Sequence, residues 1–243
     1  VSAQQALHIT GNVAVDTAGN NSSFAGVISG SAKLVKEGAG SLTLSGVNTY
    51  AGSTDINAGT LVISQDANLG KAGTGVAINN ATLSLNGSVA VDRTIALAGT
   101  TATVNTTTGS SSLVKEVSGS ATLVKTGAGT LTLNSANSYT GGTSVAAGKV
   151  ALDANTALGL GAATFAKATE LSLGISKGVS VSNAIKTDGV ITQSNNFDSS
   201  LTGVISGAGK LVKDTNATGT LTLTGANSYT GGTSVDAGTV AVD

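Results

Sequence analysis

The 243-residue chain contains one long segment three times, and this internal repeat limits the possible folds more than any other feature. The copies occupy residues 34–64, 123–153 and 211–243. One tyrosine stands at the same place in each copy, at spacings of 89 and 90 residues: Tyr50, Tyr139 and Tyr229. Self-similarity at a fixed period indicates a tandem array, in which each unit contacts mainly its neighbours.

Within each copy the apolar residues follow a period of two, as in Leu42-Thr43-Leu44. This alternation is typical of short, half-buried strands, and the flanking Gly, Asn and Ser residues favour tight bends. A sandwich or a barrel also contains many short strands, but neither explains the long repeat. The stacked coils of a parallel β-helix do explain the long repeat. With about 20–25 residues per coil, each repeat contains about four coils, and we expect matching tyrosines on one side of the rod.

The composition agrees with a narrow solenoid and excludes several other classes. Aromatic residues make up 2% of the chain, and proline is absent, as expected where nearly every backbone N–H bonds to a neighbouring coil. Without cysteine there is no disulfide or thiolate metal site, and His8 is the only histidine. Twelve basic and thirteen acidic residues, with the single arginine Arg93, give no basic footprint for nucleic acid. No apolar run predicts membrane insertion by this segment. Val1 in place of a methionine indicates a fragment of a longer chain or a mature product.

The repeated pattern resembles the passenger-associated strand repeat of bacterial autotransporters. It reads Gly-x-Gly-(Thr/Ser)-Leu-Thr-Leu, followed by Asn-(Thr/Ser)-Tyr and then Ala-Gly-x-(Leu/Val). The first copy departs from the other two at residues 51–53, and the third has two extra residues near Asn216. The resemblance implies a right-handed parallel β-helix that forms a single array over residues 1–243. It also implies type V secretion and a location outside the cell or on the bacterial surface.

The repeated polar residues are assigned structural roles. Asparagines at such turns usually bond to the backbone, and the tyrosines are too far apart to form one platform for stacking glycans. Three lysines at matching positions are interpreted as solvated turn residues that discourage edge pairing, or as a sparse basic row: Lys36, Lys125 and Lys213. The residues that define the repeat are Asn48, Tyr50, Gly59, Asn137, Tyr139, Gly148, Asn227, Tyr229 and Gly238.

No motif indicates catalysis. The carboxylates are scattered, and Ala146 stands where the other copies have Asp55 and Asp236. We therefore expect no catalytic residue, cofactor or metal site, and no enzymatic activity. Outward Thr-x-Thr pairs such as Thr130-Leu-Thr132 would need to recur on nearly every coil to order water, whereas in sequence they return chiefly once per repeat.

The sequence therefore predicts a structural stalk that supports adhesion, cell–cell contact or self-association, either end to end or lateral. Glycans of host or bacterial surfaces are the other expected partners. Two alternatives stay open: a fibre-forming extracellular subunit, and the scaffold of a carbohydrate-active β-helix whose active face lies outside this segment.

Overall fold

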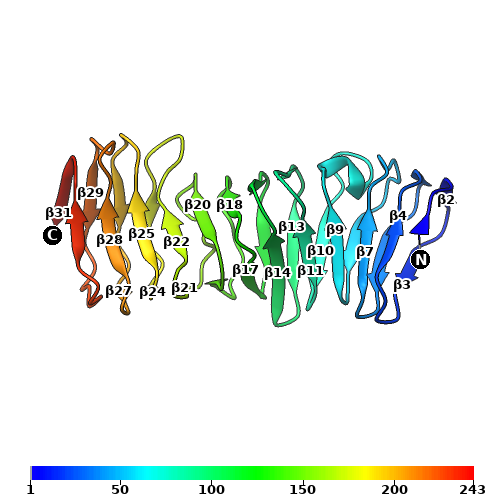
Figure 1. Ribbon diagram of the computed structural model, residues 1–243, viewed down its shortest axis with the longest axis horizontal. Coiled ribbons are helices and arrows are strands. Elements are labelled where there is room, and N and C mark those ends of the chain that lie inside the picture. Colours follow the sequence, from blue (N-terminus) through cyan, green and yellow to red (C-terminus); the bar gives the residue numbers. More distant parts are fainter. Residues whose placement is uncertain (1) are drawn as a thin grey trace.

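The computed structural model describes residues 2–243, which form one elongated parallel β-solenoid of about 12 turns (Figure 1). The two ends of the chain lie at opposite ends of the rod. Each coil has three strand positions, so the rod has three faces, which we number in the order in which the first coil visits them. Successive coils pair in parallel, so that Leu42 pairs with Leu61 and Thr60 pairs with Thr82. The predicted parallel β-helix is confirmed.

Face 1 carries one uninterrupted sheet of eleven strands. Its strands are β1 (Ser2–Ala3), β4 (Ser22–Phe24), β7 (Ser41–Leu44), β9 (Thr60–Ile63), β11 (Thr82–Leu85), β14 (Thr101–Thr106), β17 (Thr122–Thr126), β19 (Thr143–Val145), β21 (Ala163–Phe165), β24 (Ile185–Thr187) and β27 (Ile205–Ser206).

Face 2 is divided into a two-stranded and an eight-stranded sheet. The first contains β2 (Leu7–Ile9) and β5 (Ile28–Gly30). The single helical turn of the described residues, the 3₁₀ helix η1 (Asp66–Leu69), lies between the two sheets in chain order. The second contains β12 (Ala90–Val91), β15 (Ser110–Leu113), β18 (Thr130–Leu133), β20 (Lys149–Leu152), β22 (Glu170–Ser172), β25 (Val190–Gln193), β28 (Lys210–Lys213) and β30 (Thr233–Val235).

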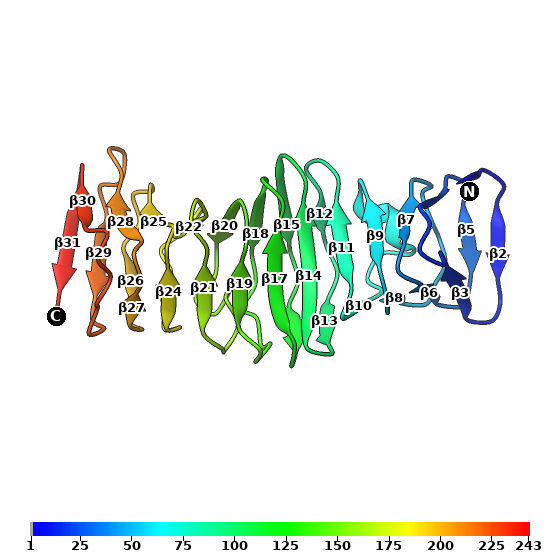
Figure 2. The ribbon, with the colours of Figure 1, turned by 60° about the horizontal axis from the view of Figure 1, so that its bottom comes forward.

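Face 3 is divided as well, into sheets of six and four strands (Figure 2). The first contains β3 (Val13–Asp16), β6 (Leu34–Glu37), β8 (Thr54–Ile56), β10 (Val76–Asn79), β13 (Ile95–Ala98) and β16 (Val117–Gly119). The second contains β23 (Ser180–Val181), β26 (Ser199–Leu201), β29 (Thr220–Leu223) and β31 (Thr239–Val242).

The sequence repeat advances by one face from copy to copy. Its Leu-Val-Lys strand is β6 on face 3 in the first copy, β17 on face 1 in the second and β28 on face 2 in the third. The chain therefore makes four full turns plus one further face before the pattern returns. The expectation of about four coils per repeat holds, and the extra third of a turn rotates each copy around the rod.

The matching tyrosines therefore do not lie on one side, and that part of the prediction was wrong. Tyr50 follows β7 and precedes β8, which places it on face 2, whereas Tyr139 lies between β18 and β19 on face 3. Tyr229, between β29 and β30, lies on face 1. The tyrosine segment is not a strand in any copy. Because of this rotation, the tyrosine segment of the first copy interrupts the strands of face 2, and that of the second copy interrupts the strands of face 3. Face 1 keeps its long sheet.

The core is a column of stacked aliphatic side chains inside the three faces. Leu42, Leu61, Leu83 and Val104 occupy one inner row on four successive coils and are almost completely buried. Alternate residues of the same strands point outward, as in the Thr-Leu-Thr-Leu sequence of β18. No helix of the described residues is long and apolar enough to span a bilayer.

Candidate functional site

The repeated asparagines join neighbouring coils. Asn48 is buried, its Oδ1 accepts a hydrogen bond from the Ile28 amide at 2.8 Å, and its Nδ2 donates to the Asn68 carbonyl at 2.6 Å. Asn137 makes the equivalent bonds to the Val117 amide and the Ala157 carbonyl, at 2.8 and 2.6 Å. One side chain thus satisfies backbone groups of the coils on both sides, where no strand is present to do so.

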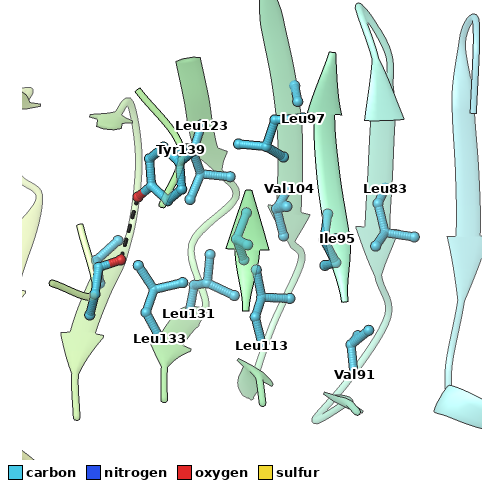
Figure 3. Packing of buried hydrophobic residues seen from close by; sticks show 14 of the residues in the cluster. Leu83, Val91, Ile95, Leu97, Val104, Leu113, Leu123, Leu131, Leu133 and Tyr139 are labelled. Carbon is cyan, nitrogen blue, oxygen red and sulfur yellow. Dashed lines mark hydrogen bonds between the residues drawn. The ribbon is translucent and has the colours of Figure 1, made fainter. Parts of the chain in front are cut away.

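The repeated tyrosines fill the core beside these asparagines. The hydroxyl of Tyr139 is 2.6 Å from the Thr143 hydroxyl, which in turn donates to the Leu158 carbonyl at 3.0 Å. Figure 3 shows the ring of Tyr139 among leucines of the column, including Leu123. Tyr50 repeats the arrangement with Thr54 at 2.6 Å, and both tyrosines are 0% exposed.

A glycine of the next coil covers each buried ring. Gly159 has a φ of +71°, and an added Cβ would lie 2.6 Å from the Tyr139 ring. Gly70, with a φ of +85°, stands over Tyr50 in the same way, at 2.7 Å. A side chain there would meet both backbone strain and the ring. The asparagine, the tyrosine and the covering glycine therefore form one packing unit, which we call the tyrosine plug.

Within the described residues, the third copy contains only part of a tyrosine plug. Tyr229 bonds to the Thr233 hydroxyl at 2.5 Å and Asn227 accepts from the Ile205 amide at 2.8 Å, but both side chains are partly exposed. Among the described residues, no coil follows that of β31, so no covering glycine is present. The third copy is thus a natural comparison for the two buried ones.

The repeated lysines are buried inside the rod, and both expectations for them, solvated turn residues or a basic surface row, were wrong. The Lys125 ammonium donates to the carbonyls of Thr126, Gly127 and Ala147 at 2.8, 2.7 and 3.0 Å. Lys36 makes the equivalent set of three bonds, and Lys213 donates to the Ala217 carbonyl at 2.8 Å. All three lysines are 0% exposed. They satisfy carbonyls that point inward where the chain turns between faces.

A repeated glycine closes each lysine corner. Gly59, Gly148 and Gly238 have φ values of +64°, +75° and +68°, a left-handed conformation that favours glycine. An added Cβ on Gly148 would lie 2.5 Å from the Gly127 carbonyl oxygen and 2.9 Å from the Lys125 Nζ. The glycine lets two successive corners approach closely enough for one ammonium to bond to both.

Arg93 is a structural residue to which the sequence assigned no role. Its side chain is completely buried, and its Nε lies 3.0 Å from a carboxylate oxygen of Asp66 in η1. The guanidinium also donates to the carbonyls of Gly70 and Lys71, at 2.9 and 2.8 Å. At the corresponding place after the second copy, Asn183 donates to the Gly159 and Gly161 carbonyls at 3.0 and 2.6 Å. Both side chains hold the segment that covers a tyrosine plug.

The buried groups predict an unusual dependence of stability on alkaline pH. Burial lowers the pKa of Lys125 to about 8, below its ordinary value of 10.5, and burial raises the pKa of Tyr50 to about 12. Between pH 8 and 10 the unfolded chain binds more protons at lysine than the folded one, so stability rises with pH. Above pH 10 the unfolded tyrosines ionise first, so stability falls. Urea unfolding midpoints between pH 7.5 and 11 should therefore peak near pH 10.

The variant Lys125→Met separates the two contributions. Methionine fills similar space without a titrating group, so the rise between pH 8 and 10 should become smaller while the fall above pH 10 stays. A wild-type midpoint that decreases steadily from pH 8 to 10 would contradict the buried-lysine contribution.

Face 1 has an outer surface with almost no charge. Lys125 and Lys186 are the only charged residues in its eleven strands, and Lys125 points into the core. By contrast, Asp55 lies on face 3, and face 2 carries Lys149 and Glu170, whose side chains form an ion pair at 2.8 Å. From β4 to β21 the outward residues of face 1 are small and polar or aliphatic. We call this surface the uncharged face.

Hydroxyl groups form rows along the uncharged face. Strand pairing places Ser41, Thr60, Thr82 and Thr103 in one row on four successive coils. A second row, two residues further along each strand, contains Thr43 and Ser84. Val62 lies between them in this row, so a pair of hydroxyls does not recur on every coil, although strands between the repeats contribute hydroxyls of their own. Each coil thus adds hydrogen-bonding groups to the same flat surface.

The described residues show no cluster of three or more metal-ligating side chains. The buried tyrosine plugs and the lysine corners use their polar groups internally. Outward hydroxyl groups come both from the repeats, such as Thr60 and Thr132, and from the segments between them, such as Thr82.

Comparisons with known proteins agree with this architecture. The family model described as "Passenger-associated-transport-repeat" matches residues 34–63, 123–152 and 218–242. The chain is similar to the adhesin BmaC autotransporter of Brucella suis biovar 1 (strain 1330), with 43% identity over 122 residues. That match covers 50% of this chain and 4% of the adhesin, so the chain corresponds to a small part of that much longer protein. No solved structure matches the chain significantly.

Proposed function

We propose that this chain, which carries the repeats of an autotransporter passenger, is a stalk segment of an adhesin exported to the bacterial surface. The observation that supports this role most directly is the direction of the repeated side chains. The buried asparagines, tyrosines and lysines of the first two copies serve coil-to-coil cohesion, and few groups are left for chemistry at the surface. The proposed role is mechanical, with no reaction catalysed by this segment.

We further propose that the uncharged face lets two rods associate laterally. Its eight strands from β4 to β21, at about 4.8 Å spacing and each about 13 Å long, give a surface of about 500 Å². Standard protein interfaces bury about 800 Å² on each partner. One segment alone would therefore associate weakly, and the effect would add up along a longer rod.

The lack of charge supports a second copy as the partner. A two-fold interface brings the same patch of both copies together, so charges of one sign on that patch would repel one another. Face 1 avoids such repulsion along most of its length, because its outward residues are hydroxyls, amides and small aliphatic groups. The other faces carry the charges that keep the rod soluble.

A charge placed on the uncharged face should test lateral association. We expect the double variant Thr82→Lys, Thr103→Lys to weaken self-association at least tenfold in sedimentation velocity across a concentration series. The physical reason is that four lysines of the same charge, two from each copy, would be gathered in one interface. The fold should persist, because both side chains lie in the outward row.

The matched control is Thr132→Lys, a substitution of the same chemistry on face 2. It should leave association unchanged. If the wild-type chain stays monomeric at the highest concentration, or if both variants weaken association equally, lateral pairing through face 1 is refuted. The stalk role would be refuted separately, by small-angle scattering that shows a compact particle.

A further inference from the structure

Three successive loops project from the corner between faces 2 and 3 and form the main irregularity of the outer surface. They connect β22 to β23, β25 to β26 and β28 to β29, and comprise residues 173–179, 194–198 and 214–219. At the same corner of earlier coils, the connections are only residues 92–94 and 114–116. The first two long loops form what we call the ridge, and the two extra residues of the third repeat fall in the loop beside it.

The ridge holds apolar side chains in water. Phe197 is 44% exposed and Ile175 is 50% exposed. The Phe197 amide donates to the Asn195 Oδ1 at 3.0 Å, while the Gln193 side chain donates to the Phe197 carbonyl at 2.6 Å. Asn195 also donates to the carbonyls of Leu173 and Gly174 in the neighbouring loop. The loop is thus fixed by hydrogen bonds in a form that leaves its phenyl ring available, which lowers the entropic cost of binding.

The ridge forms one wall of a groove on face 2. The groove has a volume of about 420 Å³, within the range of small-molecule sites. Its floor contains the outward residues of β15, β18, β20 and β22, and Ile175 and Asn195 line it from the ridge. Four of the floor residues carry hydroxyl groups: Ser110, Thr130, Thr132 and Ser172.

The groove has no free charge to attract an ionic ligand. Lys149, the only charged residue of the lining, has its ammonium 2.8 Å from the Glu170 carboxylate. The groups of the groove that remain available to a ligand are hydroxyls and one amide, beside exposed apolar side chains. This combination matches a neutral saccharide, which presents many hydroxyls and apolar ring faces together.

An extended peptide fits the groove less well. A peptide that adds to a sheet needs the unpaired backbone groups of an edge strand. The floor is instead the face of a sheet whose strands pair with neighbours on both sides, as β18 pairs with β15 and β20. A ligand on this floor can bond only to side chains.

We infer that the face 2 groove and the adjoining ridge bind a neutral oligosaccharide, with Ile175 as the apolar contact in the groove wall. The inference rests on the proposed adhesive role and names a ligand class for it. The site is distinct from the uncharged face, so glycan binding and lateral association are separable.

The test is a glycan array of neutral, sialylated and sulfated oligosaccharides, probed with the full 243-residue chain. We expect binding to members of the neutral set. For the strongest binder, calorimetric titration should show at least tenfold weaker affinity for Ile175→Ala, which removes the apolar wall, and for Thr132→Lys, which fills the groove. Both changes affect exposed or outward side chains, and circular dichroism verifies that the fold is kept.

Two matched controls separate the site from the rest of the rod. Leu160→Ala truncates another exposed apolar residue, 64% exposed, and Thr43→Lys changes the position of face 1 that corresponds to Thr132. Neither should alter glycan affinity. Absence of neutral binders, preference for charged glycans, retention of affinity in both groove variants or capture of peptides instead would overturn the inference. None of these results would change the self-association predicted for face 1.

Discussion

Replacing Arg93 with alanine is expected to lower the free energy of unfolding by about 3–5 kcal/mol, the range for breaking a buried ion pair by removing one partner. The guanidinium is completely buried and bonds to Asp66 and to backbone carbonyls of the segment that follows η1. Without it, the carbonyls of Gly70 and Lys71 lose a donor in a place that water does not reach easily. Urea unfolding followed by circular dichroism measures the change.

The second repeat supplies the control for this prediction. Asn183 occupies the equivalent position and bonds to two carbonyls with a much shorter side chain. Arg93→Asn should therefore be less damaging than Arg93→Ala, because an amide can replace part of the hydrogen bonding. Equal losses for the two variants, or a loss below about 1 kcal/mol for alanine, typical of surface changes, would show that Arg93 does not hold the covering segment.

The fold could be predicted because two periods in the sequence agree. Alternation of apolar and polar residues indicated the strands, and the regular spacing of the three repeated tyrosines indicated the stacked array. The rotation by one face could not be read from that spacing. The coils differ in length, since Leu42 pairs with Leu61 but Thr60 pairs with Thr82. A repeat length alone therefore does not fix a fraction of a turn.

The burial of the repeated lysines was indicated by the alternation of the sequence but was not predicted from it. In Leu34-Val35-Lys36, the alternation that points Leu34 inward also points Lys36 inward, and both are 0% exposed. A charged residue was assumed to face water. The assumption failed because the corner supplies three carbonyls at hydrogen-bond distance, as for Lys125. Buried ammonium groups are tolerated where such acceptors converge.

The outward surfaces were harder to predict, since they depend on which strands share a face. The residues of the uncharged face come from strands scattered from β4 to β21, and only the pairing register brings Thr60, Thr82 and Thr103 into one row. The groove likewise combines Ser110 of β15 with Asn195 of the ridge, which lie far apart in the sequence. The two extra residues of the third copy were the one visible sign of irregular loops at that corner.

The tyrosine plug can be tested within one chain, because the repeated tyrosine is buried in two copies and partly exposed in the third. Tyr139→Ala should lower the free energy of unfolding by about 3–5 kcal/mol, as for large aromatic truncations in a core. The ring is 0% exposed, and its loss would leave a cavity beneath Gly159 and remove the bond between the tyrosine and Thr143 hydroxyls. Gly159 cannot fill the space, since it has no side chain.

The comparison is Tyr229→Ala in the third copy. Within the described residues, Tyr229 is partly exposed and has no covering glycine. Its truncation in this 243-residue chain therefore removes little buried surface, and we expect a loss of about 1 kcal/mol. Urea unfolding of the two variants beside the wild type gives the difference directly. Similar losses at both positions would mean that the covering coil adds little, and that the tyrosines act only through local bonds such as that of Tyr229 to Thr233. A large loss at Tyr139 alone would establish the covered ring as the feature that binds one coil to the next.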